Sequence, residues 1–245
     1  MKKALLIVLA IALVPFSAFA VDGVVLINDA TVKAMGGYPL VISNPGSYRL
    51  SGNLTVPNEN TTAIFMNNDN INLDLNGFSI LGPTVCVGFP VTSCSPKGTG
   101  NGVDFGARRN ITVVNGTIRG MGHHGIAADA GGSSGGHVER IHADSNGTDG
   151  IRIAYGTVSG STAVGNGANG ISTDHSTISG NTVAGNNTDG IFGSLSTVSG
   201  NTVTFSNTGI FLVCPSSIVG NTATDSSSNL ITSGSGCSVA NNAAP

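Results

Sequence analysis

The chain lacks tryptophan and is poor in charged residues, and the low charge narrows the classes of protein to which it can belong. Aspartate, glutamate, lysine and arginine make up only 9% of the 245 residues, and the formal net charge is −3. A nucleic-acid-binding domain needs a basic stripe, and this composition supplies none. Disordered chains have few β-branched residues and a high net charge, whereas valine, isoleucine and threonine recur regularly here. We therefore expect a folded protein without a nucleic-acid partner.

Only one long apolar run occurs, and it lies at the N-terminus. Two lysines precede the apolar residues Ala4 to Val14, and Ala18 and Ala20 fit the small-residue rule for cleavage. This order is that of a secretory signal peptide, and the run is shorter than the about 20 residues that span a bilayer. We expect residues 1–20 to be a signal peptide cleaved after Ala20. The mature chain would then be secreted or periplasmic, without a transmembrane anchor; an uncleaved anchor is the alternative.

A 20-residue repeat dominates the second half of the chain. Apolar residues recur at this spacing in two columns: Val138, Val158, Ile178, Val198 and Ile218, and Ile151, Ile171 and Ile191, with Ile210 one residue early. In a stack of coils, equivalent residues lie above one another at the spacing of neighbouring strands, about 4.8 Å. Valine and isoleucine pack well on such a surface, and a single coil cannot bury its inner face alone. The repeat therefore predicts an all-β, right-handed parallel β-helix with coils of about 20 residues.

Other repeat folds fit the sequence less well. Leucine-rich repeats need several leucines per unit, but leucine is rare after Leu81. The first half follows the same repeat with insertions, and we expect loops at about residues 83–100 and 130–136. Residues 29–35, followed by two glycines, predict a short helix that caps the N-terminal end of the stack. Residues 21–245 then form one domain.

Four cysteines in an exported chain suggest two disulfides. Cys86 and Cys94 lie in one segment rich in glycine and proline, so they can close a small loop. Cys214 and Cys237 lie about one repeat apart, so they can meet on adjacent coils. A metal site is the rival interpretation, but no CxxC pair is present.

Several strings resemble a known group of proteins. The segment Leu73 to Ile80 (LDLNGFSI), the repeated ISGNTV and the repeated DGI resemble the pectate-lyase-like right-handed parallel β-helix superfamily. That superfamily includes polysaccharide lyases, glycoside hydrolases, epimerases, phage tailspikes and adhesins, so the resemblance implies the fold and leaves the reaction open. It also implies that calcium is a possible cofactor, although nothing in the sequence requires a cofactor.

Titratable residues crowd into the middle of the chain, between Asp104 and Tyr155, and no lysine or arginine follows Arg152. An acidic polysaccharide needs a cation that holds its carboxylates, and sugar chemistry needs a titratable group beside that cation. His124 and Asp149 each stand immediately before the glycine that opens a strand, so we expect them to meet on adjacent coils. The candidate site residues are Arg119, His124, Asp149 and Arg152. An ordinary solvated surface is the alternative for this charged stretch.

Two further hypotheses receive weaker support. The string GTDGI at 147–151 and the string GHHG at 122–125 resemble parts of the polygalacturonase motifs. The order of the two strings is reversed, however, and the paired aspartates that a glycosidase requires are missing. A metal site would use His123, His124, His137 and His142, but their spacing matches no compact motif.

The function expected from the sequence is that of an exported β-helix protein that binds a polysaccharide or surface glycan along one lateral face. Whether the protein also modifies that glycan stays open; an enzyme of this type would be a lyase, epimerase or hydrolase. The alternative is a structural or adhesive surface module without chemistry. The sequence does not predict the oligomeric state.

Overall fold

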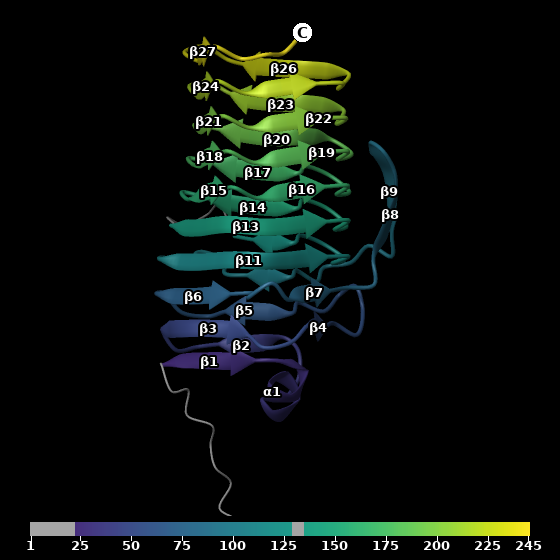
Figure 1. Cartoon of the computed structure of the whole chain (residues 1–245), viewed down its shortest axis with the longest axis vertical. Helices are drawn as coiled ribbons and strands as arrows, with labels where there is room; N and C mark the ends of the chain where they lie inside the picture. The colour runs from purple at the N-terminus through teal and green to yellow at the C-terminus, as the bar shows by residue number, and fades with distance from the viewer. Residues whose placement is uncertain (1–22, 129–134) are drawn as a thin grey trace, which may run out of the picture.

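The computed structural model describes residues 23–128 and 135–245, which form a stack of parallel coils (Figure 1). The expected signal peptide at 1–20 lies outside the described residues, as does most of the expected loop at 130–136. Gly136 of that loop already begins a strand. Each coil contributes up to three short strands, and the strands of successive coils pair in parallel. Three faces of the stack result.

The first and second faces belong to one 16-stranded sheet, because two long strands, β11 (Ile111–Arg119) and β13 (Gly136–Asp144), run through both of them. The remaining strands of the first face are β1 (Val24–Ile27), β3 (Gly46–Leu50), β6 (Ile71–Asp74), β15 (Thr157–Ser159), β18 (Thr177–Ser179), β21 (Thr197–Ser199), β24 (Ser217–Val219) and β27 (Ser238–Ala240). Those of the second face are β4 (Leu54–Thr55), β7 (Ser79–Leu81), β16 (Thr162–Val164), β19 (Thr182–Ala184), β22 (Thr202–Thr204) and β25 (Thr222–Thr224).

The third face is a separate sheet of nine strands. It consists of β2 (Leu40–Ile42), β5 (Ile64–Met66), β10 (Val103–Asp104), β12 (Ile126–Ala127), β14 (Ile151–Ala154), β17 (Ile171–Asp174), β20 (Asp189–Ser194), β23 (Thr208–Val213) and β26 (Ser228–Ser233). The repeat fixes the register, since Ile151 pairs with Ile171, which pairs with Ile191, which pairs with Ile210. These four side chains are buried in the core. The predicted β-helix and its apolar columns are therefore confirmed.

Polar ladders hold the coils in register at two of the corners. Asn181, Asn201 and Asn221 lie between the first and second faces, and each side chain accepts the backbone N–H of the equivalent residue one coil earlier, at 2.9 Å. Asn166 and Asn186 form a second ladder between the second and third faces. Both ladders are buried, so their hydrogen bonds satisfy corner backbone groups that strand pairing leaves open.

The N-terminal end of the stack carries the predicted cap. Helix α1 (Asp29–Ala34) is capped by Asn28, whose side chain accepts the N–H of Thr31, and Val32 packs into the core. Both predicted disulfides are present, Cys86–Cys94 and Cys214–Cys237.

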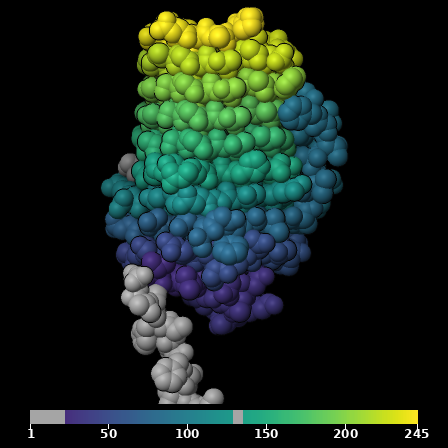
Figure 2. Space-filling model, in the orientation of Figure 1, coloured from purple at the N-terminus to yellow at the C-terminus, as the bar shows by residue number. Residues whose placement is uncertain are grey.

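The expected loop at 83–100 contains an antiparallel hairpin, β8 (Val85–Gly88) and β9 (Val91–Ser95). The hairpin lies lengthwise against several later coils, where its atoms cover one edge of the stack (Figure 2). Val91 N–H donates to the Gly185 carbonyl at 2.9 Å, and the rings of Phe89 and Phe205 lie 5.5 Å apart. The insertion is thus a brace along the stack.

Candidate functional site

A column of side-chain acceptors runs along the start of the third face and includes two of the predicted site residues. Each member accepts the backbone N–H of the next member: Asn101 from His124 at 3.1 Å, His124 from Asp149 at 3.3 Å, Asp149 from Asn169 at 3.0 Å, and Asn169 from Asp189 at 3.1 Å. His124 Nδ1 therefore takes a place that asparagine or aspartate holds in the other coils. The column ties each coil to the next one before the strand begins.

His124 and Asp149 do meet on adjacent coils, as the sequence predicted. His124 Nδ1 lies 3.3 Å from Asp149 Oδ2, and the two side chains are only 6% and 8% exposed. Thr148 Oγ1 lies 2.9 Å from the same ring nitrogen. Because Nδ1 faces three polar groups of the protein and both side chains are buried, this pair supports the coil and offers little surface to a ligand.

The neighbouring His123 is a poor cation. Its Nδ1 lies 3.1 Å from Asn101 Oδ1, and its ring lies 3.8 Å from that of His124. Burial lowers the pKa of His123, and the nearby His124 and Arg152 lower it further, against the opposing effect of Asp149. Burial therefore favours the neutral form of this imidazole.

The two predicted arginines lie on different faces. Arg119 ends the second-face part of β11, where its Nε lies 3.2 Å from Asp144 Oδ2, and it lines a depression beside the hairpin residue Cys86. Arg152 lies in β14 on the third face and forms no ion pair with any described residue. Arg119 is thus already neutralised and stands apart from Arg152.

Arg152 borders a groove on the outside of the third face. Ala128, which follows β12, and strands β14, β17 and β20 line it; the strand residues are Arg152, Ile153, Ser172, Thr173, Asp174, Phe192 and Ser194. Phe192 stacks on Phe211 of the next coil, with ring centroids 5.7 Å apart and planes inclined by 7°. The groove therefore combines a guanidinium, a carboxylate, hydroxyls and an aromatic strip, a mixture of apolar and polar groups that suits an organic ligand.

One corner of the stack forms the edge of this groove. Tyr155, His175 and Leu195 follow β14, β17 and β20 directly, and all three have left-handed backbones, with φ of 53°, 49° and 50°. The rings of Tyr155 and His175 stack at 4.7 Å, and His175 Nδ1 lies 2.9 Å from Asp174 Oδ2. Asp174 therefore belongs both to the groove and to its edge.

Comparison with known proteins identifies the architecture. Neither a protein-family model nor a curated protein matches the sequence. Among solved structures, the Dettilon tailspike protein aligns with a TM-score of 0.50 at 16% identity, over 82% of this chain and 47% of the tailspike chain. The A-module of mannuronan C-5 epimerase AlgE4 from Azotobacter vinelandii aligns at 12% identity with a TM-score of 0.47, over 80% of this chain and 64% of its own.

The chain has the parallel β-helix fold. At these identities the likeness is one of fold, and the chain spans about half the length of the tailspike protein. Along residues 23–128 and 135–245, no helix is long and apolar enough to cross a membrane.

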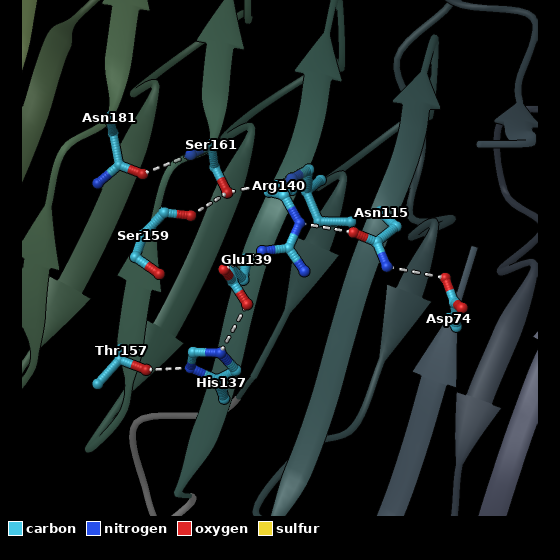
Figure 3. Close-up of polar contacts among 10 residues, drawn as sticks. Asp74, Asn115, His137, Glu139, Arg140, Thr157, Ser159, Ser161 and Asn181 are labelled. Atoms are coloured by element: carbon cyan, nitrogen blue, oxygen red, sulfur yellow. Dashed lines mark hydrogen bonds and ion pairs between the residues drawn. The ribbon is translucent and has the colours of Figure 1, made fainter. Parts of the chain in front are cut away.

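A second polar cluster lies on the first face of the β-helix (Figure 3). Arg140 Nε donates to Asn115 Oδ1 at 2.7 Å, and Asn115 donates to Asp74 at 3.1 Å. Glu139 accepts a hydrogen bond from Arg140 and lies 3.4 Å from His137, which contacts Thr157 in the next coil. Every charge here has a partner on its own or a neighbouring strand, so the cluster braces the coils.

The histidines that a metal site would need do not come together. His137 lies on the first face, His142 on the second-face part of β13, and His123 and His124 at the start of the third face. Within the described residues, no group of three or more histidine, cysteine, aspartate or glutamate side chains is arranged to hold a metal ion.

Three residues of the groove and its edge were missing from the sequence-based site: Asp174 and Phe192 in the lining and His175 beside Asp174. They belong to coils that contain no lysine or arginine, so no cation in their own stretch of sequence marked them. Stacking brings Arg152 beside them, because Arg152 pairs with Ser172 and Ser172 with Phe192. The register of the repeat is the sequence signal from which they could have been found.

Proposed function

We propose that this β-helix binds an acidic polysaccharide in the groove of the third face. The observation that carries the proposal is the guanidinium of Arg152, which forms no ion pair with a described residue and lies beside the stacked rings of Phe192 and Phe211. A guanidinium matches the geometry of a carboxylate, and burial of an aromatic strip under a sugar adds apolar contact. The open, elongated face suits a polymer that crosses several coils.

Export of the protein is part of the same proposal. The two disulfides fit an oxidising compartment, and the order of the first twenty residues is that of a signal peptide cleaved after Ala20. Outside the cytoplasm the chain would meet wall, capsule or matrix polysaccharides, and its partner would be a surface or extracellular glycan.

The test is a panel of acidic and neutral polysaccharides, assayed for binding and for products, with and without calcium. Arg152→Ala should weaken binding about tenfold, the worth of one well-placed charged contact. Arg140→Ala is the matched control, because this exposed arginine lies on the first face in an ion pair of its own. Retention of full affinity by Arg152→Ala would place the site elsewhere.

The same panel separates binding from chemistry and from a passive role. New products would add a lyase, epimerase or hydrolase activity to the proposal. The alternative, a structural or adhesive module, predicts no binding to any soluble glycan. The sequence made His124 a candidate site residue, and His124→Asn tests that role. Asparagine keeps the side-chain acceptor that the column needs, as Asn101 and Asn169 do.

A further inference from the structure

One column of outward-facing side chains passes through the groove and changes its chemistry from coil to coil. The strands of the third face pair in register, so this groove column consists of Arg152, Ser172, Phe192, Phe211 and Ile231. Neighbouring strands lie about 4.8 Å apart, which is close to the length of one sugar in an extended glycan. A glycan laid along the groove column would therefore place about one sugar over each coil.

Only the first member of the groove column is a cation. Arg152 is exposed and forms no ion pair with a described residue. No lysine or arginine follows it in the sequence, and the one later histidine, His175, has its Nδ1 2.9 Å from Asp174 Oδ2. A ligand carboxylate therefore finds an arginine at one coil and none at the coils that follow.

The later members of the groove column are apolar. Phe192 and Phe211 are partly exposed, their ring centroids lie 5.7 Å apart, and Ile231 extends the strip by one coil. A carboxylate held against this strip would lose water without gaining a partner, whereas the C–H groups of a neutral sugar gain from the contact. Asp174 lines the groove beside the strip and repels a second anion. These coils therefore favour neutral sugars.

Charge also sets the direction in which an acidic ligand can extend from Arg152. In the coils before Arg152, the column continues with Ala127 and then Asp104. Ala127 is only 8% exposed, and Asp104 Oδ2 accepts a hydrogen bond from Asn101 at 2.9 Å. A carboxylate at this position repels an acidic sugar. The ligand therefore extends from Arg152 toward Phe211, which lies three coils, or about 14 Å, further along the stack.

We propose that the groove recognises a heteropolysaccharide in which two or more neutral sugars separate one acidic sugar from the next. The proposal rests on the proposed function of the groove and narrows its ligand class. The acidic sugar lies at Arg152, and the neutral sugars lie over Ser172, Phe192 and Phe211. A polymer with a uronate at every position satisfies one carboxylate at Arg152 and places the next ones beside Asp174 and the apolar strip.

The experiment compares the binding of oligosaccharides of equal length from three acidic polymers. Polygalacturonate carries a carboxylate on every sugar, hyaluronan on every second sugar, and deacylated gellan on one sugar of each tetrasaccharide; dextran is the neutral comparison. The wild-type chain should bind the gellan fragment about tenfold more tightly than the polygalacturonate fragment, because the latter places an unpaired carboxylate on the apolar strip. Hyaluronan should bind with intermediate affinity.

Variants of the groove column test the cause of this preference. Phe192→Arg adds a cation two coils from Arg152, so it should raise the affinity for polygalacturonate and lower that for gellan. Phe192→Ala should weaken gellan binding and leave polygalacturonate binding nearly unchanged. Phe65→Ala is the matched control, because this partly exposed phenylalanine belongs to the same outward column beyond Asp104, and both affinities should stay unchanged. Thermal melting followed by circular dichroism shows whether each variant is folded.

The outcomes separate the two proposals. Tighter binding of polygalacturonate than of gellan, if it is lost in Arg152→Ala, would overturn the heteropolysaccharide and leave an acidic-glycan groove intact. Full gellan affinity in a folded Phe192→Ala variant would overturn the heteropolysaccharide as well. Absence of binding to every fragment, or binding of dextran as tight as that of gellan, would overturn the proposed function together with this inference.

Discussion

Removal of one asparagine side chain from the ladder should destabilise the protein far more than the loss of so few atoms suggests. Asn181 is 1% exposed, and its side chain makes three contacts across coils. Its Oδ1 accepts the N–H of Ser161 at 2.9 Å, and its Nδ2 donates to the carbonyl of Val158 at 3.0 Å and to Asn201 Oδ1 at 2.9 Å. In Asn181→Ala, the Ser161 N–H loses its acceptor and the Val158 carbonyl loses a donor.

Each buried backbone group left without its partner costs about 1–3 kcal/mol. A water molecule that enters the vacated space restores part of this loss. We therefore expect Asn181→Ala to lower the free energy of unfolding by about 2–4 kcal/mol. Thr182→Ala is the control, because the neighbouring Thr182 side chain is exposed and such changes usually stay within about 0.5 kcal/mol.

The assay is urea denaturation followed by circular dichroism, with both disulfides intact. The slope against urea should stay the same in all variants, so that a shifted midpoint reports stability. A loss below about 1 kcal/mol in Asn181→Ala would refute the reasoning, because it would mean that the corner backbone finds other partners at little cost.

Three further predictions follow from the core, the brace and the buried histidine. Ile171→Asp should prevent folding, since it places an unpaired charge in a column that is fully buried; loss of the circular dichroism signal of the folded chain checks this. Gly185→Val should detach the hairpin, because a Cβ at Gly185 would lie 2.1 Å from the ring of Phe89. Faster proteolysis within residues 85–95 checks this detachment, and Phe89→Ala should show the same faster proteolysis. Burial lowers the pKa of His123 from 6.5, so the unfolded chain takes up a proton first and stability falls as pH drops below 6.5 toward the folded-state pKa. Denaturation of His123→Gln over that range should show a weaker pH dependence, and an unchanged one would contradict this role.

The repeat made the stack predictable from sequence, because each apolar column meets the same requirement for burial in every coil. Ile151, Ile171 and Ile191 need a common buried environment, and only stacking provides it. The hairpin at 85–95 was not predictable in this way. Its strands pair with each other and rest on Gly185 and Phe205, which lie far along the chain, so no local period marks them.

One contact of the candidate site was also predictable from the repeat. The sequence predicted that His124 and Asp149 meet, since this follows from the register of the coils. It did not foresee that His124 would be buried in a structural column, because the same register applies whether a side chain points to solvent or supports the next coil. Nor did it predict the groove, whose lining comes from four coils that differ in sequence.

In a repeat protein the same structural requirement recurs in every coil, so positions that depart from the repeat carry most of the functional information. His124 departs from a column of asparagine and aspartate, yet its Nδ1 accepts the same hydrogen bond, so the departure needs no function to explain it. Tyr155 and His175 have left-handed backbones, but so do Arg140, Phe205 and Asp225 at other corners, so this conformation does not set them apart. The column of Arg152, Ser172 and Phe192 differs in every coil and lines the groove of the third face. Function is therefore best sought in that groove.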